Sequence, residues 1–549
     1  MIFSDFRGDR YRLHNKHKSK TGELYMIILG VTHPISWNNG ACILVDGKLI
    51  AMVEEERFNR FKHSPRTSPD MSIEFCLKRA GVTLDEVDHI AIGWESAERQ
   101  KKKKKYPWEF LLRQLPFRHM DEKMKFVNHH VAHALSSYYV SGFDRSNIVS
   151  LDGYGGSESG ILAIAEGDDL RVVKSIPNRN SWGHMYGEIT SKLGFKSHSD
   201  EGKIMGLAAY GQPDENEFTF IDWGRDIPVI DKKGFKKYLA GITARTQGEE
   251  LGQHHKNLAA TVQHTLERAA LQMSSYLRDI SGSGNLCVSG GCALNCSMNG
   301  VLLRSDHVDN IYVQPAAHDI GTALGAAVSV YKDVVGHRPD IVLEHPYYGP
   351  DYTNEEVEYE LKRYKLSNFK RCGDIAKEAA TLIADNKTVG WFQGRMEFGP
   401  RALGGRSILG NPKNKDMKDI VNKSIKGREP WRPFAPSFLA EDYADYVKQP
   451  YNSPFMIIAF QAIEEKVSDI ASAAHVDNTV RVQSVRKEVA PRYWELINEF
   501  KKITGVPALL NTSFNVAGQP IVCTPRDAIM TFFGCGLDYL AIEDYLVWK

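Results

Sequence analysis

One arrangement of expected strands occurs twice in this sequence, and this repetition limits the possible folds more than any other feature. Each copy has a strand, a polar loop, a second strand, a tight turn and a third strand. The expected strands lie at 26–32, 41–45 and 49–53 in the first copy and at 148–151, 160–165 and 170–173 in the second. The copies begin about 120 residues apart, and a helical pattern lies in or before each. We therefore predict an internal duplication that forms two α/β lobes with a nucleotide cleft between them.

The size and composition of the chain indicate an ordinary globular protein with more than one domain. At 549 residues the chain exceeds what one hydrophobic core supports. A net charge of +1 gives no reason to expect a nucleic-acid partner, and no apolar run reaches the length of about 18 residues that a membrane span needs. Eight cysteines without paired CxxC motifs favour reduced thiols. We expect a cytoplasmic monomer or homodimer with no nucleic-acid or membrane partner.

Proline clusters and changes in pattern divide the chain into expected domains. We predict a disordered extension at 1–25, one domain at 26–340, a linker at 341–352 and a second domain at 353–549.

Three histidines within five residues form the first candidate site. His129 and His133 are four residues apart, so on a helix they share one face and can bind one metal ion. His130 points about 100° away around that helix and is not expected to be a ligand. Asp152 ends an apolar strand before a glycine turn. Asp319 follows another strand, where it serves either as a helix N-cap or as a further ligand.

Two glycine-containing segments in the first domain are weaker signals for a nucleotide. Lys203 lies in a short glycine-spaced element of a kind that is more often a helix cap and turn. At Gly290-Gly291 a strand runs into a helix start near Asn295. Glycines there let a ligand approach the backbone, although a plain tight turn would look the same.

The second domain contains the densest cluster of cations in the chain. Arginines and lysines lie among glycines and apolar residues at 393–408 and 422–436, which favours an anion site because guanidinium groups and backbone N–H groups bind phosphate oxygens. Two later segments, 475–483 and 510–515, have the composition of site loops.

Read together, these motifs resemble those of the nodulation and cephamycin-type O-carbamoyltransferases, the NodU/CmcH family. The resemblance covers nearly all of 26–549, in the family's order. The segments that carry it are Asn128–Ala134, Ser150–Gly153, Gly202–Ala208, Gly290–Asn295, Phe398–Leu409, Trp431–Pro436 and Asn511–Asn515.

The resemblance implies a fold class and a two-step reaction. It implies an α/β, duplicated actin-like (ASKHA) N-terminal domain and a YrdC-like α/β C-terminal domain. The C-terminal domain would form carbamoyl adenylate from carbamoyl phosphate and ATP, with Mg(II) accompanying ATP. The N-terminal domain would pass the carbamoyl group to a hydroxyl of a small-molecule acceptor at a divalent metal, with iron(II) the expected ion.

The resemblance and the residue chemistry together give the expected site residues. The metal ligands are His129, His133, Asp152 and Asp319, and the N-terminal nucleotide site contains Lys203, Gly290, Gly291 and Asn295. The carbamoyl-phosphate and ATP site contains Arg395, Arg401, Arg406, Lys423, Arg428, Arg432, His475, Arg481, Asn511, Ser513 and Asn515.

The first loop of the chain supplies the expected catalytic residue and departs from the family pattern. His33 is the candidate base or hydrogen-bond acceptor near the carbamoyl carbonyl. Pro34 stands where the family has an acid, and Trp37 stands where it has a small residue, which marks an altered acceptor pocket. We expect 170–204 and the loops near Trp37 and Trp182 to line that pocket.

Three other functions fit this sequence less well. An actin-like sugar kinase would explain the lobes but would leave the C-terminal arginines without a task. A protein-directed carbamoyltransferase of hydrogenase maturation would need zinc-finger cysteine pairs, which this sequence lacks. A nucleotide-switched interaction protein would use neither the metal ligands nor the anion sites.

Overall fold

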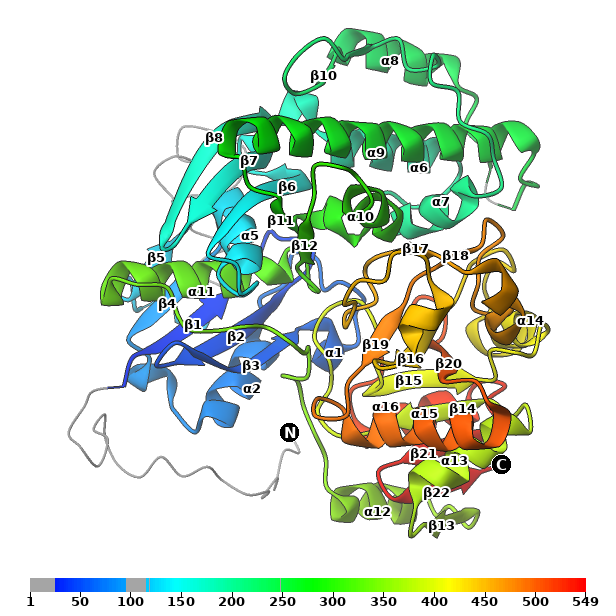
Figure 1. The fold of residues 1–549 in the computed structure, drawn as a ribbon. Coiled ribbons are helices and arrows are strands. Elements are labelled where there is room, and N and C mark those ends of the chain that lie inside the picture. Colours follow the sequence, from blue (N-terminus) through cyan, green and yellow to red (C-terminus); the bar gives the residue numbers. More distant parts are fainter. Residues whose placement is uncertain (1–24, 95–114, 118, 247) are drawn as a thin grey trace.

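The computed structural model describes residues 25–94, 115–117, 119–246 and 248–549, so nearly all of the expected extension 1–25 lies outside the described residues. Two five-stranded sheets in the N-terminal part repeat one topology (Figure 1). In spatial order, the first contains β3 (Lys48–Glu54), β2 (Gly40–Val45), β1 (Ile27–Val31), β4 (His89–Ile92) and β5 (Met124–Phe126). The second contains β8 (Asp169–Pro177), β7 (Glu158–Glu166), β6 (Arg145–Gly155), β11 (Asn285–Ser289) and β12 (Asn310–Val313).

The pairing directions in these two sheets match strand for strand. In each lobe the first three strands pair antiparallel to one another. The fourth strand pairs parallel to the first, and the fifth pairs parallel to the fourth. The duplication predicted from the sequence is thus confirmed as two lobes of the same topology.

Helices from each lobe cover the sheet of the other lobe. Helix α11 (Ile320–Val335) packs on the first sheet, α5 (His129–Tyr138) packs on the second, and the two helices pack against each other (Figure 1). The first sheet is also covered by α2 (Asp70–Ala80), and the second by α6 (Trp182–Lys192) and α9 (Gln253–Ser281). The N-termini of α5 and α11 therefore meet at the junction of the lobes.

Small residues permit this close packing of α11. A Cβ atom at Gly325 would lie 1.7 Å from the carbonyl oxygen of Ala132 in α5. Across the helix, a Cβ atom at Gly30 in β1 would lie 2.2 Å from the carbonyl oxygen of Ala323. Any larger side chain at either glycine would separate the helix from its neighbour.

The C-terminal domain contains one eight-stranded sheet. Its strands, in spatial order, are β13 (Phe369–Arg371), β22 (Tyr545–Trp548), β21 (Tyr539–Ile542), β14 (Val389–Phe392), β15 (Arg406–Gly410), β20 (Ala508–Ser513), β16 (Ala435–Leu439) and β19 (Gln483–Val485). Its helices are α12 (Asn354–Arg363), α13 (Ile375–Ala384), α15 (Pro491–Thr504) and α16 (Pro525–Phe533). Trp391 and Leu409 belong to the core shared with α13 and α15, whereas Phe392 and Ile408 belong to that of α12 and α16. This alternation shows that helices cover both faces of the sheet.

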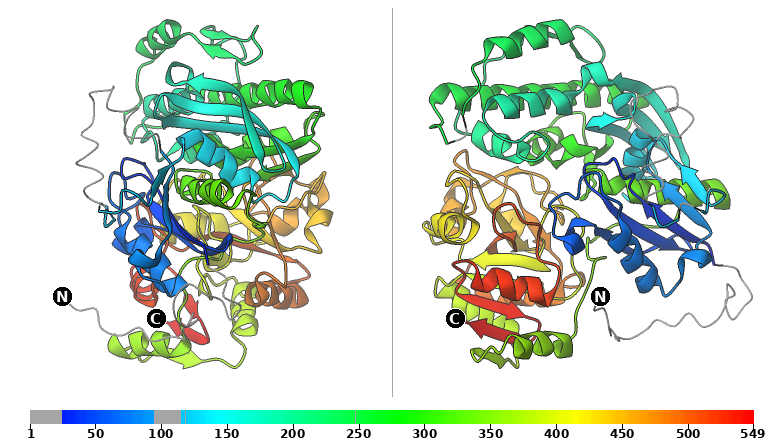
Figure 2. Two further views of the ribbon diagram at one scale, coloured as in Figure 1. Left: turned by 90° about the vertical axis from the view of Figure 1, so that its left-hand side faces the viewer. Right: turned by 180° about the vertical axis from the view of Figure 1, so that it is seen from behind.

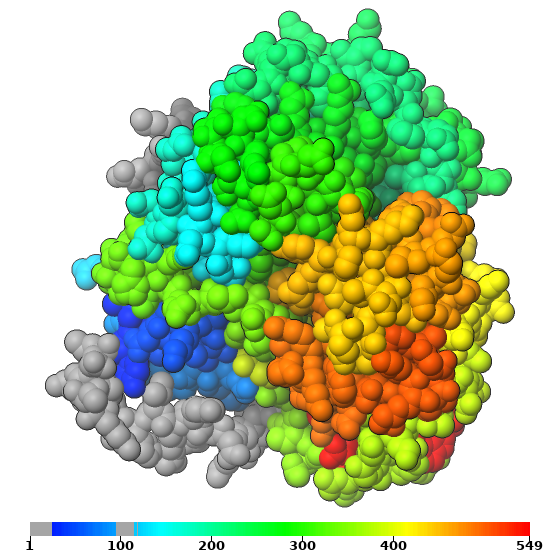
Figure 3. All heavy atoms as spheres, viewed as in Figure 1, coloured from blue at the N-terminus to red at the C-terminus, as the bar shows by residue number. Residues whose placement is uncertain are grey.

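The C-terminal domain lies against both N-terminal lobes (Figures 2 and 3). Asn299 donates through Nδ2 to the carbonyl oxygen of Ile457 at 2.9 Å, and Arg395 donates to that of Ile50 at 3.0 Å. Residues 341–352, the expected linker, form neither helix nor strand. The predicted fold class, an actin-like duplicated domain followed by an α/β domain, is confirmed. In the described part of the chain, no helix has both the length and the apolar character that crossing a bilayer requires.

Candidate functional site

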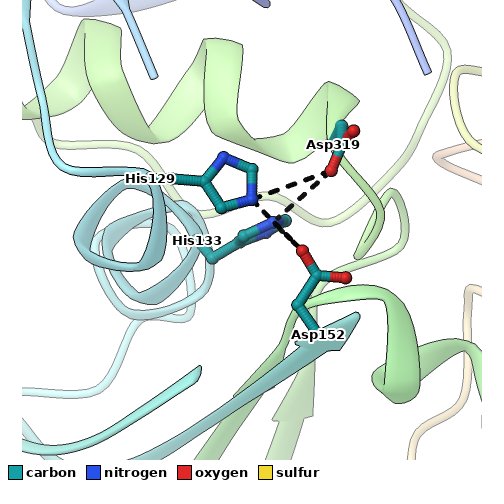
Figure 4. Close-up of side chains that lie close together, drawn as sticks. All are labelled: His129, His133, Asp152 and Asp319. Carbon is teal, nitrogen blue, oxygen red and sulfur yellow. Dashed lines mark hydrogen bonds and ion pairs between the residues drawn. The ribbon is translucent and has the colours of Figure 1, made fainter. Parts of the chain in front are cut away.

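Four side chains converge where the two lobes meet (Figure 4). His129 and His133 lie one turn apart on α5, Asp152 lies on β6, and Asp319 directly precedes α11. One nitrogen or oxygen atom from each residue lies within 4.8 Å of the other three. The structure therefore brings together all four residues that were predicted as metal ligands.

The distances between these atoms fit a single divalent ion. Nε2 of His129 lies 3.2 Å from Oδ2 of Asp152 and 3.8 Å from Oδ1 of Asp319. Nε2 of His133 lies 3.5 Å and 3.9 Å from the same two oxygens. Ligands bound about 2.1 Å from a metal lie roughly 3.0–3.5 Å apart. Small side-chain movements suffice to complete such a site.

Hydrogen bonds outside the cluster orient its ligands. His129 donates from Nδ1 to the carbonyl oxygen of Gly93 at 3.2 Å, which leaves Nε2 as the ring nitrogen that faces the centre. Asp319 accepts the backbone N–H of Trp37 through Oδ2 at 2.7 Å, so its Oδ1 faces the imidazoles. Both contacts have the form in which a protein prepares side chains for a metal.

The glycine turn after β11 fixes Asp152. Gly291 donates its N–H to Oδ1 of Asp152 at 3.2 Å, and Gly153 does so at 2.8 Å. Gly290 has φ of +83°, and a Cβ atom there would lie 2.2 Å from the carbonyl oxygen of Leu151. Glycine is therefore required for the turn to approach β6.

The charges in the cluster also favour a cation. Burial by itself would raise the pKa of Asp152, but hydrogen bonds from His129 and His133 hold that pKa well below its usual range. Burial and the negative charge of Asp152 raise the pKa of Asp319. Two buried carboxylates beside two imidazoles form a mixed nitrogen and oxygen set that suits Fe(II), Mn(II) or Zn(II).

His33 lies beside this cluster in a defined tautomeric state. Its fully buried ring stacks on Trp94 with centroids 5.5 Å apart, and Trp94 meets His129 edge-on at 4.8 Å. The N–H of Ile35 donates to Nδ1 of His33 at 3.2 Å, so the proton of the neutral ring is on Nε2. Burial and nearby His129 lower the pKa of His33 to about 3. This geometry suits a hydrogen-bond donor rather than the expected base.

Four arginines of the C-terminal domain lie close to one another, and Arg401, Arg428, Arg432 and Arg481 are here called the cation cluster. Burial, together with the charges of Arg481 and Arg432, lowers the pKa of Arg401 to about 9. Burial and the charge of Arg432 likewise lower the pKa of Arg428 to about 9. The Nε groups of Arg401 and Arg481 are buried and donate no hydrogen bond among the described residues. Buried cations without enough partners indicate a site for anionic ligands.

Lys426 adds a fifth basic side chain to this region. Its ammonium group donates to Oγ of Ser513 at 3.2 Å and to Oδ1 of Asn515 at 2.7 Å. Burial and the charges of Arg428 and Arg432 lower the pKa of Lys426 well below its usual range. The predicted loop 510–515 is thus connected to the cation cluster through this lysine.

The segment of Lys62 and His63 lies near both the cation cluster and the four-residue cluster. Burial lowers the pKa of Lys62, as does the nearby positive charge of Arg432. The next residue, His63, lies 6.3 Å from Trp37 between ring centroids. Trp37 in turn holds Asp319 through its backbone N–H. The two predicted sites therefore lie on either side of one segment of the first lobe.

Comparison with known families gives this arrangement a context. Residues 27–114 and 110–328 match the model of the carbamoyltransferase N-terminus, and residues 380–549 match that of the carbamoyltransferase C-terminus. The chain belongs to the carbamoyltransferase family. The resemblance proposed from the sequence motifs is confirmed, and the protein is an enzyme of this class.

Relatives of this carbamoyltransferase include rhizobial nodulation proteins. Nodulation protein NolNO of Sinorhizobium fredii is 40% identical over 542 residues, covering 93% of this chain and 79% of NolNO. Nodulation protein NolO of Bradyrhizobium diazoefficiens is 40% identical over 436 residues, covering 77% of this chain and 79% of NolO. Full-length HypF, solved in a phosphate- and nucleotide-bound form, is 14% identical with a TM-score of 0.35 over 56% of each chain.

Several residues expected at the carbamoyl-phosphate and ATP site of this carbamoyltransferase make other contacts. Arg395 and the fully buried Arg406 donate to backbone carbonyl oxygens, among them those of the expected linker. His475 bonds through Nε2 to the carbonyl oxygen of Gly206 at 2.8 Å. Asn511 donates to the carbonyl oxygen of Ala402 and to Oγ of Ser437 inside the domain. Lys423 is exposed, whereas Lys426 reaches the site loop. These side chains therefore do not lie with the cation cluster: Arg395, Arg406, Lys423, His475 and Asn511.

The structure also places two residues expected at the nucleotide site, Lys203 and Asn295, and one expected near the acceptor, Trp182. Lys203 pairs with Asp200 at 3.2 Å and with Glu429 of the C-terminal domain at 3.0 Å. Asn295 caps the helix that follows it, with Oδ1 accepting from the N–H of Met298. The Trp182 side chain is 1% exposed and packs in the core of the second lobe, whereas Ser181 before it donates to the carbonyl oxygens of Asp152 and Gly153. That the loops near Trp37 and Trp182 line the acceptor pocket stays a prediction.

Sequence analysis missed Lys62 and His63 as parts of the region between the sites. Both follow the short helix α1 (Glu56–Asn59) in a polar segment without periodicity, so no pattern distinguished them from a surface loop.

Proposed function

We propose that this carbamoyltransferase forms carbamoyl adenylate at the cation cluster and transfers its carbamoyl group to a hydroxyl at the metal centre. The observation that carries the proposal is the proximity of the two sites. The cation cluster, in which Arg432 pairs with Glu429 at 3.7 Å, lies near Lys62. The next residue, His63, lies beside Trp37, which holds Asp319 of the cluster that fits a divalent ion.

The first step brings two polyanions together, which the cation cluster suits. Water cleaves carbamoyl phosphate to carbamate and phosphate, and a carbamate oxygen then attacks the α-phosphorus of ATP while pyrophosphate leaves. Arg432, Arg481 and Lys426 supply positive charge for these groups, and Mg(II) accompanies ATP. Because carbamate is a weak nucleophile that decomposes readily, the buried position of these residues favours its capture over its loss to solvent.

The second step takes place between His33 and the four-residue cluster. The acceptor oxygen forms a bond to the carbamoyl carbon, the bond from that carbon to the phosphate oxygen breaks, AMP leaves with the electron pair, and the hydroxyl proton is released. A divalent ion held by His129, His133, Asp152 and Asp319 would neutralise phosphate charge, and iron(II) is the ion that the family resemblance implies. We assign His33 the role of donating Nε2–H to the carbamoyl oxygen, on which negative charge develops.

The acceptor enters, in this proposal, beside Trp37. The Trp37 ring lies 5.5 Å from that of the exposed His198, which is adjacent to Gly153 of the second lobe. The two rings thus come from different lobes. The backbone of Trp37 holds Asp319, and the ring of His198 lies beside Gly153, which holds Asp152. Their amphipathic faces suit a small molecule that carries a ring and a hydroxyl group.

Isotope exchange tests the first step without knowledge of the acceptor. Carbamoyl phosphate should stimulate exchange of labelled pyrophosphate into ATP, because adenylate formation is reversible on the enzyme. Exchange that is equally fast without carbamoyl phosphate, or formation of ADP, would count against the proposal.

A further inference from the structure

A buried ion pair of the first lobe lies against the loop of the C-terminal domain that carries Arg401. Arg57, in the short helix α1, is 1% exposed, and its Nη2 donates to Oε1 of Glu54 at 3.0 Å. Glu54, at the end of β3, is 3% exposed. Taking such charges out of water is costly, so a buried ion pair is weak evidence for stability. What the pair holds in place therefore matters more than its own energy.

The two charged side chains bind both polar backbone groups of one residue of the C-terminal domain, Gly399. The N–H of Gly399 donates to Oε1 of Glu54 at 2.7 Å. The carbonyl oxygen of Gly399 accepts from Nη2 of Arg57 at 2.8 Å. Hydrogen bonds to charged groups are stronger than those between neutral groups. The first lobe therefore sets both the position and the orientation of the backbone two residues before Arg401.

The second lobe closes the other side of this loop. Gly399 has φ of +91°, and a Cβ atom there would lie 3.0 Å from the carbonyl oxygen of Pro315. Arg401 donates through Nη2 to the carbonyl oxygen of Leu294 at 3.3 Å. The loop is thus held between the two lobes and has little room to shift. Where the guanidinium of Arg401 lies therefore depends on the N-terminal domain as well as on its own domain.

Arg57 also holds the segment that lies near both proposed sites. Its Nη1 donates to Oε1 of Glu56 at 2.8 Å. Glu56 in turn accepts the backbone N–H of His63 through Oε2 at 2.5 Å. One buried guanidinium is therefore in contact with the Gly399 loop and, through Glu56, with the segment beside Trp37.

We propose that Arg57 is a positioning residue for adenylate formation, because with Glu54 it holds Gly399 so that the guanidinium of Arg401 faces the anions of the first step. Arg57 does not touch the substrates and acts through Arg401. This inference rests on the proposed function, since it takes Arg401 to bind those anions. It means that the first lobe completes a site of the C-terminal domain, so that the first step requires the two domains to be in contact.

Pyrophosphate exchange by the full-length chain at varied carbamoyl phosphate concentration tests this role. Arg57→Lys keeps the charge but cannot reach Glu54, Glu56 and Gly399 at once. It should raise the half-saturating concentration of carbamoyl phosphate about 10-fold or more and change the saturated rate less than about threefold. Arg60→Lys is the matched control, because Arg60 also joins the first lobe to the C-terminal domain but donates to the carbonyl oxygens of 520 and 521. It should change either quantity less than about twofold.

A double variant separates positioning from a general loss of stability. If Arg57 acts through Arg401, adding Arg57→Lys to Arg401→Lys should raise the half-saturating concentration less than about twofold further. Effects that multiply, or an unchanged half-saturating concentration in Arg57→Lys alone, would overturn the inference. Circular dichroism checks each fold, and Gly399→Ala, which shifts the same loop with the ion pair intact, decides the matter if Arg57→Lys unfolds. Wild-type exchange that does not depend on carbamoyl phosphate, or an unchanged half-saturating concentration in Arg401→Lys, would instead overturn the proposed function.

Discussion

The backbone N–H of Trp37 donates to Oδ2 of Asp319 at 2.7 Å and so fastens the first loop of one lobe to the start of α11. The other carboxylate oxygen, Oδ1, faces His129 and His133. One side chain thus connects the region proposed for the acceptor with the cluster proposed for the metal. A substitution at Asp319 should therefore disturb both, whereas a change confined to the indole of Trp37 should leave the metal centre in place.

Removal of a ligand should release the metal. We expect His133→Ala and Asp319→Asn each to lower iron(II) affinity at least about 100-fold, because each removes one of four ligands. Elemental analysis after anaerobic loading and desalting measures the bound ion. His184→Ala is the matched control, since His184 is largely exposed on α6 and pairs with Glu188 of the same helix at 3.7 Å. Full metal content in both ligand variants would show that the assignment is wrong.

Two neighbouring lysines should differ sharply in their effect on adenylate formation. Lys426→Met removes the ammonium group that contacts Ser513 and Asn515, and should lower carbamoyl-phosphate-dependent pyrophosphate exchange at least about 10-fold. Lys423→Met removes an exposed charge and should change the rate less than twofold. Equal effects of the two substitutions would contradict the position assigned to Lys426.

The two lysines show why sequence spacing alone could not select the right cation. Residues Val421–Lys426 form a π-helix, in which hydrogen bonds span five residues instead of four. This changes the rotation per residue, so an α-helical pattern assigns side chains to the wrong faces. Lys423 becomes exposed and Lys426 is buried against the site loop. The basic composition predicted an anion site, but the local winding decided which side chain reaches it.

The metal centre was more accessible to sequence reasoning. His129 and His133 share a helix face at four-residue spacing, Asp152 lies in the last part of β6, and Asp319 follows β12. The strands β6, β11 and β12 run parallel, so residues after them meet at one edge of the sheet. Trp182 had no such constraint, and its sequence position did not reveal that it is buried in the core.

His33 should behave as a hydrogen-bond donor and not as a base. We expect His33→Ala to slow carbamoyl transfer about 10²–10³-fold, the usual cost of losing one donor to a developing oxyanion, and to leave pyrophosphate exchange intact. Because its pKa is lowered to about 3, His33 should contribute no ionisation near neutral pH to the transfer rate. If the wild-type pH profile has an ionisation near pH 6.5 that His33→Ala abolishes, His33 acts as a base instead.

Half-buried His63 should make the protein sensitive to acid. Burial lowers the pKa of His63 from 6.5 to about 4, so the folded state binds this proton less readily than the unfolded state. Its contribution is present above about pH 6.5 and is lost as the pH falls towards 4. Over that interval the free energy of unfolding should fall by about 1.4 kcal/mol per pH unit on account of this residue.

Urea unfolding of metal-free wild type and His63→Asn between pH 7.5 and 5.0 measures this contribution. The variant has no titrating group at this position, so its stability should decline less steeply with acid. Parallel pH dependences in the two proteins would rule out a lowered pKa for His63.

The central claim is that one chain makes carbamoyl adenylate at the cation cluster and uses it at the metal centre. The most direct measurement follows AMP, pyrophosphate and labelled carbamoyl product from ATP and carbamoyl phosphate, in wild type, Arg432→Ala and His133→Ala, with an acceptor found by screening. We predict that Arg432→Ala loses both pyrophosphate exchange and product, whereas His133→Ala keeps exchange and loses product. Loss of exchange in His133→Ala, or product formed by wild type with release of ADP instead of AMP, would contradict the account.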